Sequence, residues 1–316
     1  MQFRTQIPIS KSNFPIDYTS RIVSLGSCFA VNMNEKLDYF KFQNSCNPFG
    51  IIFNPVSIEK IISKAINQES FTENDIFFHN EQWHCFDVHS ELSDSNKEAL
   101  LQNVNQLLQS TNNQITQSTH VIITYGTAWV YRNIQSNEIV ANCHKVPQKQ
   151  FEKEILSVET CIKSIENTIK LIQKVNPNCK IIFTVSPVRH IKDGFVENQQ
   201  SKSHLITAIH QILNPKSKIL NYFPSYEIMM DELRGYRFYA EDMLHPNQVA
   251  IDYIWERFAV TWISETTHKT IEEVDVIQKG LAHRPFNPDS ELHKKFVENL
   301  NQKIAKLVLQ HPEIKF

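Results

Sequence analysis

Short apolar runs alternate with amphipathic stretches along most of this chain. Three runs rich in β-branched residues cover residues 21–25, 120–125 and 180–185. Their continuous hydrophobic character is typical of parallel strands buried on both faces of a sheet. A last strand, or a pair of strands, is predicted over residues 219–222 and 225–229.

Between these runs, apolar residues recur at the three- and four-residue spacing of amphipathic helices. The predicted helices cover residues 30–40, 93–109, 157–175, 203–213 and 246–258, and another begins at Ser57. Strands that alternate with long helices indicate a parallel sheet covered on both faces, with right-handed connections.

The chain divides by pattern into two parts. We predict an α/β domain over residues 1–262, with hairpin insertions near residues 83–87 and 130–150. Residues 263–316 are more polar and helical, and we predict a C-terminal helical extension that packs on the domain or forms a homo-oligomer contact.

Composition narrows the class of protein further. Of the 316 residues, 41% are hydrophobic and 21% are charged, and the formal net charge is -2, which provides no basic surface for nucleic acid. No apolar run is long enough to span a bilayer and residues 1–6 carry no secretory apolar core, so a cytoplasmic protein is predicted. The six cysteines include no Cys-x-x-Cys pair, which favours reduced thiols over a structural zinc site.

The first candidate for chemistry follows the first predicted strand, where residues 24–30 read Ser-Leu-Gly-Ser-Cys-Phe-Ala. Gly26 allows a tight turn from strand to helix, and Ser27 then stands at the start of the helix. Backbone N–H groups at such a helix start can stabilise an oxyanion beside a nucleophilic hydroxyl. An ordinary helix N-cap is the alternative interpretation of Ser27.

The second candidate lies near the end of the domain, where Asp242 precedes His245 by three residues, directly before a predicted helix. A carboxylate at this spacing can bind imidazole Nδ1, which leaves Nε2 to accept a proton from a nucleophile. A surface turn with a helix-capping histidine is the alternative. Together with Ser27, the pair favours catalysis by Ser27, His245 and Asp242.

These motifs resemble the GSCFA family, a group similar to the SGNH/GDSL hydrolases. The resemblance covers most of residues 20–260 and is carried by residues 25–30, 125–131, 142–145, 186–190 and 242–246. It implies a flavodoxin-like three-layer α/β/α sandwich and serine-based hydrolysis of acylated carbohydrates or lipids. It also implies that Ser27 is the nucleophile, that Asp242 and His245 complete the triad, and that the N–H of Gly50 lines the oxyanion hole.

The chain departs from the superfamily pattern at one block. Gly-x-Asn-Asp is replaced by residues 126–129, Gly-Thr-Ala-Trp, so the asparagine that donates to the oxyanion is missing. Loss of one such donor costs about 10²–10³ in rate unless another group replaces it. We expect Asn142 to replace it, with Thr127 and the more remote Arg189 as further candidates; Asn142 could equally be a turn residue.

Other polar residues are further candidates for the same site. Cys28 could attack as a thiolate, but we expect its side chain to point into the core and its N–H to serve the oxyanion hole. Gly126 and Thr127 are expected to contact substrate. His144 could bind an anionic group or belong to a solvated loop.

Arg189 and His190 follow a predicted strand, at the edge where substrate would bind, although either could instead pair with an acid. The spacing of His79, His84 and His89 fits no common ligand pattern, so no metal is predicted, and the chemistry requires no organic cofactor.

The sequence therefore predicts an ester hydrolase that acts on a small-molecule or glycan ester through an acyl-enzyme. Water or another alcohol could accept the acyl group, so an acyltransferase is an alternative. A carbohydrate- or lipid-binding protein that kept the fold but lost efficient catalysis is the alternative that the missing asparagine suggests.

Overall fold

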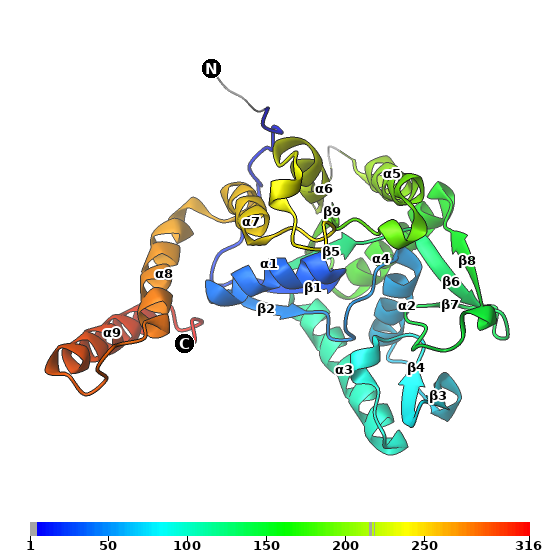
Figure 1. Ribbon diagram of the computed structural model, residues 1–316, viewed down its shortest axis with the longest axis horizontal. Helices are drawn as coiled ribbons and strands as arrows, with labels where there is room; N and C mark the ends of the chain where they lie inside the picture. The colour runs from blue at the N-terminus through cyan, green and yellow to red at the C-terminus, as the bar shows by residue number, and fades with distance from the viewer. Residues whose placement is uncertain (1–4, 215–216, 218) are drawn as a thin grey trace.

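A parallel sheet of five strands, in the order β10-β9-β5-β1-β2, forms the centre of the molecule (Figure 1). The computed structural model describes residues 5–214, 217 and 219–316, so the first four residues of the predicted domain lie outside it. The strands of the sheet are β1 (Arg21–Gly26), β2 (Gln43–Cys46), β5 (His120–Tyr125), β9 (Lys180–Val185) and β10 (Leu220–Phe223).

Helices cover both faces of this sheet. One face packs against α2 (Pro55–Ile66), α3 (Lys97–Gln117), α4 (Val158–Val175) and α5 (Phe195–Ile212). The other face packs against α1 (Cys28–Tyr39) and α7 (Gln248–Trp262), next to a short helical segment, α6 (Ser225–Glu227). The predicted α/β sandwich around a parallel sheet is therefore confirmed.

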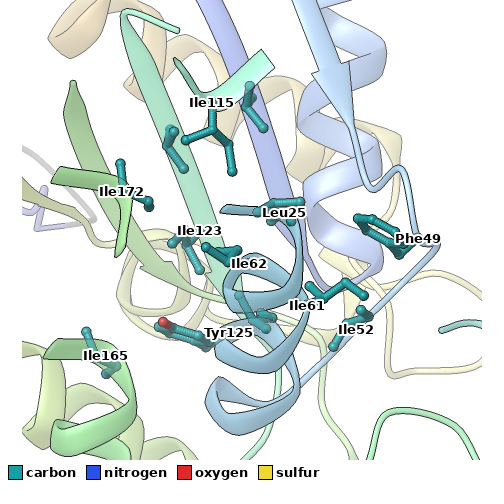
Figure 2. Packing of buried hydrophobic residues seen from close by; sticks show 14 of the residues in the cluster. Leu25, Phe49, Ile52, Ile61, Ile62, Ile115, Ile123, Tyr125, Ile165 and Ile172 are labelled. Carbon is teal, nitrogen blue, oxygen red and sulfur yellow. The ribbon is translucent and has the colours of Figure 1, made fainter. Parts of the chain in front are cut away.

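The buried side chains explain why the sheet has two covered faces. In β5, Ile123 and Tyr125 point to the face covered by α2–α5, whereas Ile122 lies in the core beneath α1 and α7. Figure 2 shows Ile123 and Tyr125 packed among side chains from α2 and α4. Alternate residues thus bury opposite faces, as the continuous apolar runs predict.

Two small antiparallel sheets are inserted in the chain, one between α2 and α3 and the other between β5 and α4. A hairpin joins β3 (Ile76–His79) to β4 (Gln82–Cys85), and a three-stranded sheet has the order β7-β6-β8. Its strands are β6 (Trp129–Asn133), β7 (Ile139–Val140) and β8 (Phe151–Ile155). Both hairpin predictions are confirmed, and β8 extends the second insertion beyond the predicted boundary.

Short helical turns complete the chain. They are Glu73–Asp75, Ser90–Leu92, Gln148–Gln150, Ile191–Asp193, Ile228–Glu232, Tyr236–Phe238 and Glu265–Thr267. Residues 225–229 are therefore helical, and the strand predicted there is wrong: Ile228 and Met229 pack in the core beneath α7, and Tyr226 packs in the core on the other face of the sheet.

The C-terminal extension consists of α8 (His268–Ala282) and α9 (Glu291–Gln310), which form a hairpin that projects beside α1 and α7 (Figure 1). Tyr39 ties it to the domain: its hydroxyl donates to Asp275 Oδ1 across 2.9 Å, and its carbonyl accepts from Gln278. In the described part of the chain, no helix is both long and apolar enough to cross a membrane.

Candidate active site

One position in the turn between β1 and α1 has room only for glycine. Gly26 has a φ of +134°, and a Cβ there would lie 2.1 Å from the carbonyl oxygen of Thr124 on β5. The next N–H, of Ser27, donates to that same carbonyl across 3.0 Å. The turn therefore delivers residues 27 and 28 tightly to the carboxyl edge of the sheet.

Ser27 is the N-cap of α1, and its side chain is completely buried. Its Oγ accepts the N–H of Phe29 at 3.3 Å, as an N-cap side chain does. Gly126, at the end of β5, packs against it so closely that an added Cβ would lie 3.3 Å from the Cβ of Ser27.

Cys28 occupies the first turn of α1 and is partly exposed. Cys28 is among the residues that line a cavity at the carboxyl edge of the sheet. Burial raises the pKa of the Cys28 thiol, while the positive charge of Lys202 and the N–H groups at the helix start act in the opposite direction.

Asp242 and His245 form the pair that the Asp-x-x-His spacing predicts. Oδ2 of Asp242 lies 2.5 Å from Nδ1 of His245, and Oδ1 accepts the N–H groups of Leu244 and His245 at 2.9 and 3.0 Å. These hydrogen bonds lower the pKa of Asp242 to about 2, so the carboxylate is ionised at neutral pH. It accepts the Nδ1 proton of the imidazole, which leaves Nε2 as the basic nitrogen.

The cavity has a volume of about 680 Å³ and brings several predicted residues together. Cys28, Thr127, Asn142, Arg189, His190 and His245 all line it. Most of its remaining wall is aromatic or aliphatic, with Phe53, Trp129, Tyr131, Phe151, Val188 and Leu244 among the lining residues.

The block that lacks the superfamily asparagine is held by α5. The Thr127 hydroxyl lies 2.9 Å from Ser201 Oγ and accepts the Trp129 N–H at 3.0 Å. The N–H of Gly126 is also committed, since it donates to the Phe53 carbonyl across 2.8 Å. Thr127 lines the cavity, but its hydroxyl is engaged within the protein.

Asn142 is better placed to donate to a ligand. Its Oδ1 accepts the N–H of His144 at 2.8 Å, and its own N–H bonds to Phe86. Among the described residues its Nδ2 group has no protein partner, and the residue lines the cavity. The amide hydrogens therefore remain free for an oxyanion or a substrate oxygen.

Gly50 does not offer the donor expected of it. Its N–H donates to the carbonyl of Asn47 across 2.8 Å, and its α-carbon faces His89, whose Cβ would lie 2.2 Å from an added Cβ. The expectation that this N–H lines the oxyanion hole is wrong, because the group is already bonded in the turn that starts at Asn47.

His144 is also placed elsewhere. Its ring is buried against Phe77 and His84, and its Nε2 donates to the carbonyl of Cys85 across 2.7 Å. Burial lowers its pKa to about 4, so the imidazole is neutral at pH 7. The residue does not line the cavity, and the expected contact with an anionic group is wrong.

Arg189 contacts the loop that carries His245. Its guanidinium lies over the rings of Tyr239 and Tyr236, at 4.4 and 5.1 Å, and donates to the carbonyl of Met243. Its backbone N–H donates to the carbonyl of Leu244 across 3.2 Å. Arg189 therefore fixes the two residues between Asp242 and His245, a role that the motif did not indicate.

His190 lines the cavity as a neutral imidazole. Burial and the nearby charges of Lys202 and His245 lower its pKa to about 3. The backbone N–H of His190 donates to Asn198 Oδ1 across 2.8 Å, and its imidazole ring packs edge-on against the ring of Phe53. A neutral imidazole in this position can donate one hydrogen bond to a ligand.

Lys202 is the functional candidate that sequence reasoning missed. The side chain is completely buried, and its Nζ donates to the carbonyls of Gly126 and Ser186 at 2.7 and 2.8 Å. Burial lowers its pKa to about 7. Polar residues at core-facing positions of α5, namely Asn198, Ser201 and Lys202, are the signal that could have revealed it.

No metal site competes with this interpretation in the described residues, where no group of three His, Cys, Asp or Glu side chains could hold an ion. Fold and site together define a parallel α/β protein in which an aspartate–histidine pair and the first residue of α1 meet at one cavity, which His245 and Cys28 both line. The chain belongs to the GSCFA family, whose model matches residues 21–258. A second family model, described as the C-terminal domain of a GSCFA domain protein, matches residues 274–316.

Two esterases are among the solved structures that match this chain. One is an acetyl esterase crystallised as a serine-to-alanine mutant with an acetate ion, at 9% identity over 81% of this chain and 99% of its own, with a TM-score of 0.37. The other is a carbohydrate esterase family 3 protein from Talaromyces cellulolyticus, at 8% identity over 80% of this chain and 99% of its own, with a TM-score of 0.36. No curated protein matches the sequence.

Proposed function

We propose that this protein hydrolyses an ester-linked acyl group in the cavity between the turn at residues 26–28 and His245. The observation that carries the proposal is the Asp242–His245 pair, in which an ionised carboxylate fixes the imidazole across 2.5 Å. A pair of this kind, at a cavity that the first residue of α1 also lines, is suited to general acid–base catalysis of acyl transfer.

The nucleophile comes from the turn itself. The family motif predicts the Ser27 hydroxyl, which is buried directly beside Cys28, a residue that lines the cavity. His245 Nε2 takes the proton of the attacking group and returns it to the leaving alcohol. The acyl-enzyme is then released by water, which loses its proton to the same nitrogen.

Donors for the oxyanion come from two sides of the cavity. The start of α1 presents the Cys28 N–H, and Asn142 presents its Nδ2 hydrogens in place of the missing asparagine. His190 adds a neutral imidazole as a further residue of the cavity wall. These groups are fixed by hydrogen bonds before substrate arrives, which is what electrostatic stabilisation of a transition state requires.

The walls of the cavity suit an ester with an apolar acyl or aryl portion. Trp129 and Tyr131 come from β6 and Phe151 from β8, so the inserted antiparallel sheet supplies much of the aromatic surface. Aromatic faces also stack on sugar rings, and both acylated carbohydrates and lipid-like esters are candidates. Transfer to an alcohol instead of water would use the same residues.

Steady-state hydrolysis of p-nitrophenyl acetate tests this function. His245→Ala and Asp242→Asn are each expected to lower kcat/KM by about 10²–10⁴-fold, because each removes or misorients the base. His283→Ala is the matched control, since His283 is an exposed histidine in the loop between α8 and α9. Equal rates for the wild type and His245→Ala would show that the pair is not catalytic.

A further inference from the structure

The buried face of α5 changes character along its length. Its C-terminal half presents Leu205 and Ile209 to the apolar core. At the same helical spacing one and two turns earlier, the buried residues are instead Asn198, Ser201 and Lys202. Burial of a polar group is costly unless the group is hydrogen-bonded, so the partners of these three side chains show what the polar half of the face does.

Two of the three side chains accept hydrogen bonds from loops that follow strands of the sheet. Asn198 Oδ1 accepts the backbone N–H of His190 across 2.8 Å, and Ser201 Oγ accepts that of Ala128 across 2.7 Å. His190 follows β9 and Ala128 follows β5. The polar half of α5 therefore holds two adjacent loops at the carboxyl edge of the sheet.

Lys202 is the third side chain, and it holds the same loops by donating. An ammonium group has three hydrogens and no acceptor, so it can face two carbonyl oxygens at once. Its Nζ donates to the carbonyls of Gly126 and Ser186 at 2.7 and 2.8 Å, and it lies 5.7 Å from the centre of the Tyr226 ring. These contacts stabilise an ammonium that has no exposed surface.

The stability of the fold alone does not explain a lysine at this position. Removal of a charged group from water is costly, and an apolar side chain of similar volume is often as stable or more stable in its place. The presence of Lys202 is better explained by the atoms that it holds in position.

One of those atoms belongs to a residue that lies directly against the proposed nucleophile. The Gly126 peptide is held on both sides, since its N–H donates to the Phe53 carbonyl across 2.8 Å and its own carbonyl accepts from Lys202. A Cβ at Gly126 would lie 3.3 Å from the Cβ of Ser27. Because Ser27 is completely buried, the position of Gly126 limits the directions that its hydroxyl can take.

We propose that Lys202 is a positioning residue for the Ser27 nucleophile and that it acts through the carbonyl of Gly126. This inference rests on the proposed ester hydrolysis, with Ser27 as the attacking group. Without the ammonium, the loop at residue 126 can shift away from Ser27, and the hydroxyl loses its orientation. A misplacement of about 1 Å can cost about 10²-fold in rate, so the effect falls on kcat. Neither Lys202 nor Gly126 is among the described residues that line the cavity, so KM should change little.

The test compares kcat and KM for p-nitrophenyl acetate in two variants of α5. Lys202→Met is expected to lower kcat at least about tenfold and to leave KM within about twofold of the wild-type value. Leu205→Ala is the matched control, because it disturbs the same buried face of α5 within the apolar core. Both are measured at a temperature where circular dichroism shows them folded, and Leu205→Ala is expected to keep the wild-type kcat.

Two results of this comparison would overturn the inference. The first is an unchanged kcat in Lys202→Met. The second is an equal loss of kcat in Leu205→Ala, since weakened packing of α5 would then explain the effect without any role for the Gly126 carbonyl.

A second variant keeps Lys202 and alters the contact through which it acts. The Cβ of Gly126→Ala would lie 3.1 Å from Phe53 Cδ1 and 3.3 Å from Ser27 Cβ, so the neighbours must move by a few tenths of an ångström. A fluorophosphonate probe, mapped by peptide mass spectrometry, reports the reactivity of Ser27 itself. Labelling of Ser27 is expected to be at least about tenfold slower in Gly126→Ala than in the wild type. Labelling at the wild-type rate would overturn the inference, whether or not Lys202→Met folds.

The double variant Lys202→Met/Gly126→Ala tests whether the two residues act on one contact. Its loss of Ser27 labelling is expected to be smaller than the product of the two single losses, because residues in one contact are not additive. A loss equal to that product would show that Lys202 does not act through Gly126.

The outcomes separate this inference from the proposed hydrolysis. Wild-type turnover with a label on Ser27, matched by the Lys202 and Gly126 variants, would overturn the inference and leave the hydrolysis in place. A wild type that is neither labelled on Ser27 nor faster than His245→Ala would overturn both.

Discussion

The Lys202 ammonium donates to the carbonyl of Gly126 across 2.7 Å, from the core-facing side of α5. It also donates to Ser186 at the end of β9, so one buried nitrogen ties together the loops that follow two adjacent strands. Gly126 in turn packs against Ser27. Lys202 therefore holds the two loops at the carboxyl edge of the sheet that lie next to the turn with the proposed nucleophile.

A pH-dependent stability difference is expected when Lys202 is replaced by Met. The folded pKa is lowered from 10.5 to about 7, so between these values the unfolded chain binds the extra proton and the folded chain does not. Folding is therefore favoured as pH rises through this window, by up to about 1.4 kcal/mol per pH unit. Below pH 7 both states are protonated, and the burial cost is fully present.

Urea unfolding at pH 6, 8 and 9.5 measures this effect. The wild type is expected to gain stability relative to Lys202→Met as pH rises, because its folded chain no longer has to bury a charged ammonium. The variant also leaves two carbonyl acceptors unpaired, at a cost of about 1–3 kcal/mol that does not depend on pH. Groups common to both proteins cancel in the difference. Lys170→Met, at an exposed position on α4, is the control, and a difference independent of pH would contradict the account.

Arg189 is expected to affect turnover more than substrate affinity. Its guanidinium stacks on Tyr239 and bonds to Met243, so it orients the loop between Asp242 and His245. Arg189→Met is expected to lower kcat by about tenfold or more with little change in KM, since misplaced catalytic groups cost rate. Arg189→Lys keeps the charge but loses the planar stacking, and should recover only part of kcat.

Separate measurement of kcat and KM for p-nitrophenyl esters distinguishes this role from the substrate contact first expected. A large rise in KM with unchanged kcat, for either variant, would mean that Arg189 binds substrate directly.

Gly26 is expected to tolerate no side chain. An added Cβ would lie 2.1 Å from the Thr124 carbonyl, and the residue has a φ of +134°. Gly235 has a similar φ of +143°, but nothing lies within 4 Å of an added Cβ. Gly235→Ala therefore measures backbone strain alone, at about 1–3 kcal/mol, and Gly26→Ala should cost more.

Thermal or urea unfolding of the two alanine variants compares these costs directly. Gly26→Ala is also expected to lose activity, because the turn must shift away from β5. Equal stability of the two variants would show that close packing against Thr124 does not shape the turn.

The central strands could be predicted because each is a short run dominated by apolar and β-branched residues. β1, β5 and β9 are buried on both faces, so their sequences carry no competing polar pattern. In contrast, β2 reads Gln-Asn-Ser-Cys and β8 reads Phe-Glu-Lys-Glu-Ile. Both are edge strands, whose pairing depends on a neighbour and not on their own hydrophobicity.

The Asp242–His245 contact could be predicted because it is local, with both partners within one turn before α7. Gly50 and His144 could not be placed from the sequence. Gly50 lies against His89, and the ring of His144 packs in an aromatic cluster with side chains of the β3–β4 hairpin. Such contacts join distant segments, and a motif does not record them.

The different surroundings of Ser27 and Cys28 have the same origin. Their sequence order says only that one precedes a helix and the other begins it. Ser27 is completely buried against Gly126, the residue after β5, whereas Cys28 is partly exposed, and the chain pattern does not specify this difference.

The most direct test of the central claim is the rate of acylation in a stopped-flow mixing of p-nitrophenyl acetate with excess enzyme. Release of p-nitrophenolate in this single turnover reports attack by the residue 27–28 turn, before any deacylation. We predict acylation at least about 10²-fold faster in the wild type than in His245→Ala, because the imidazole must remove the proton of the attacking group. Equal single-turnover rates in the two proteins would contradict the account.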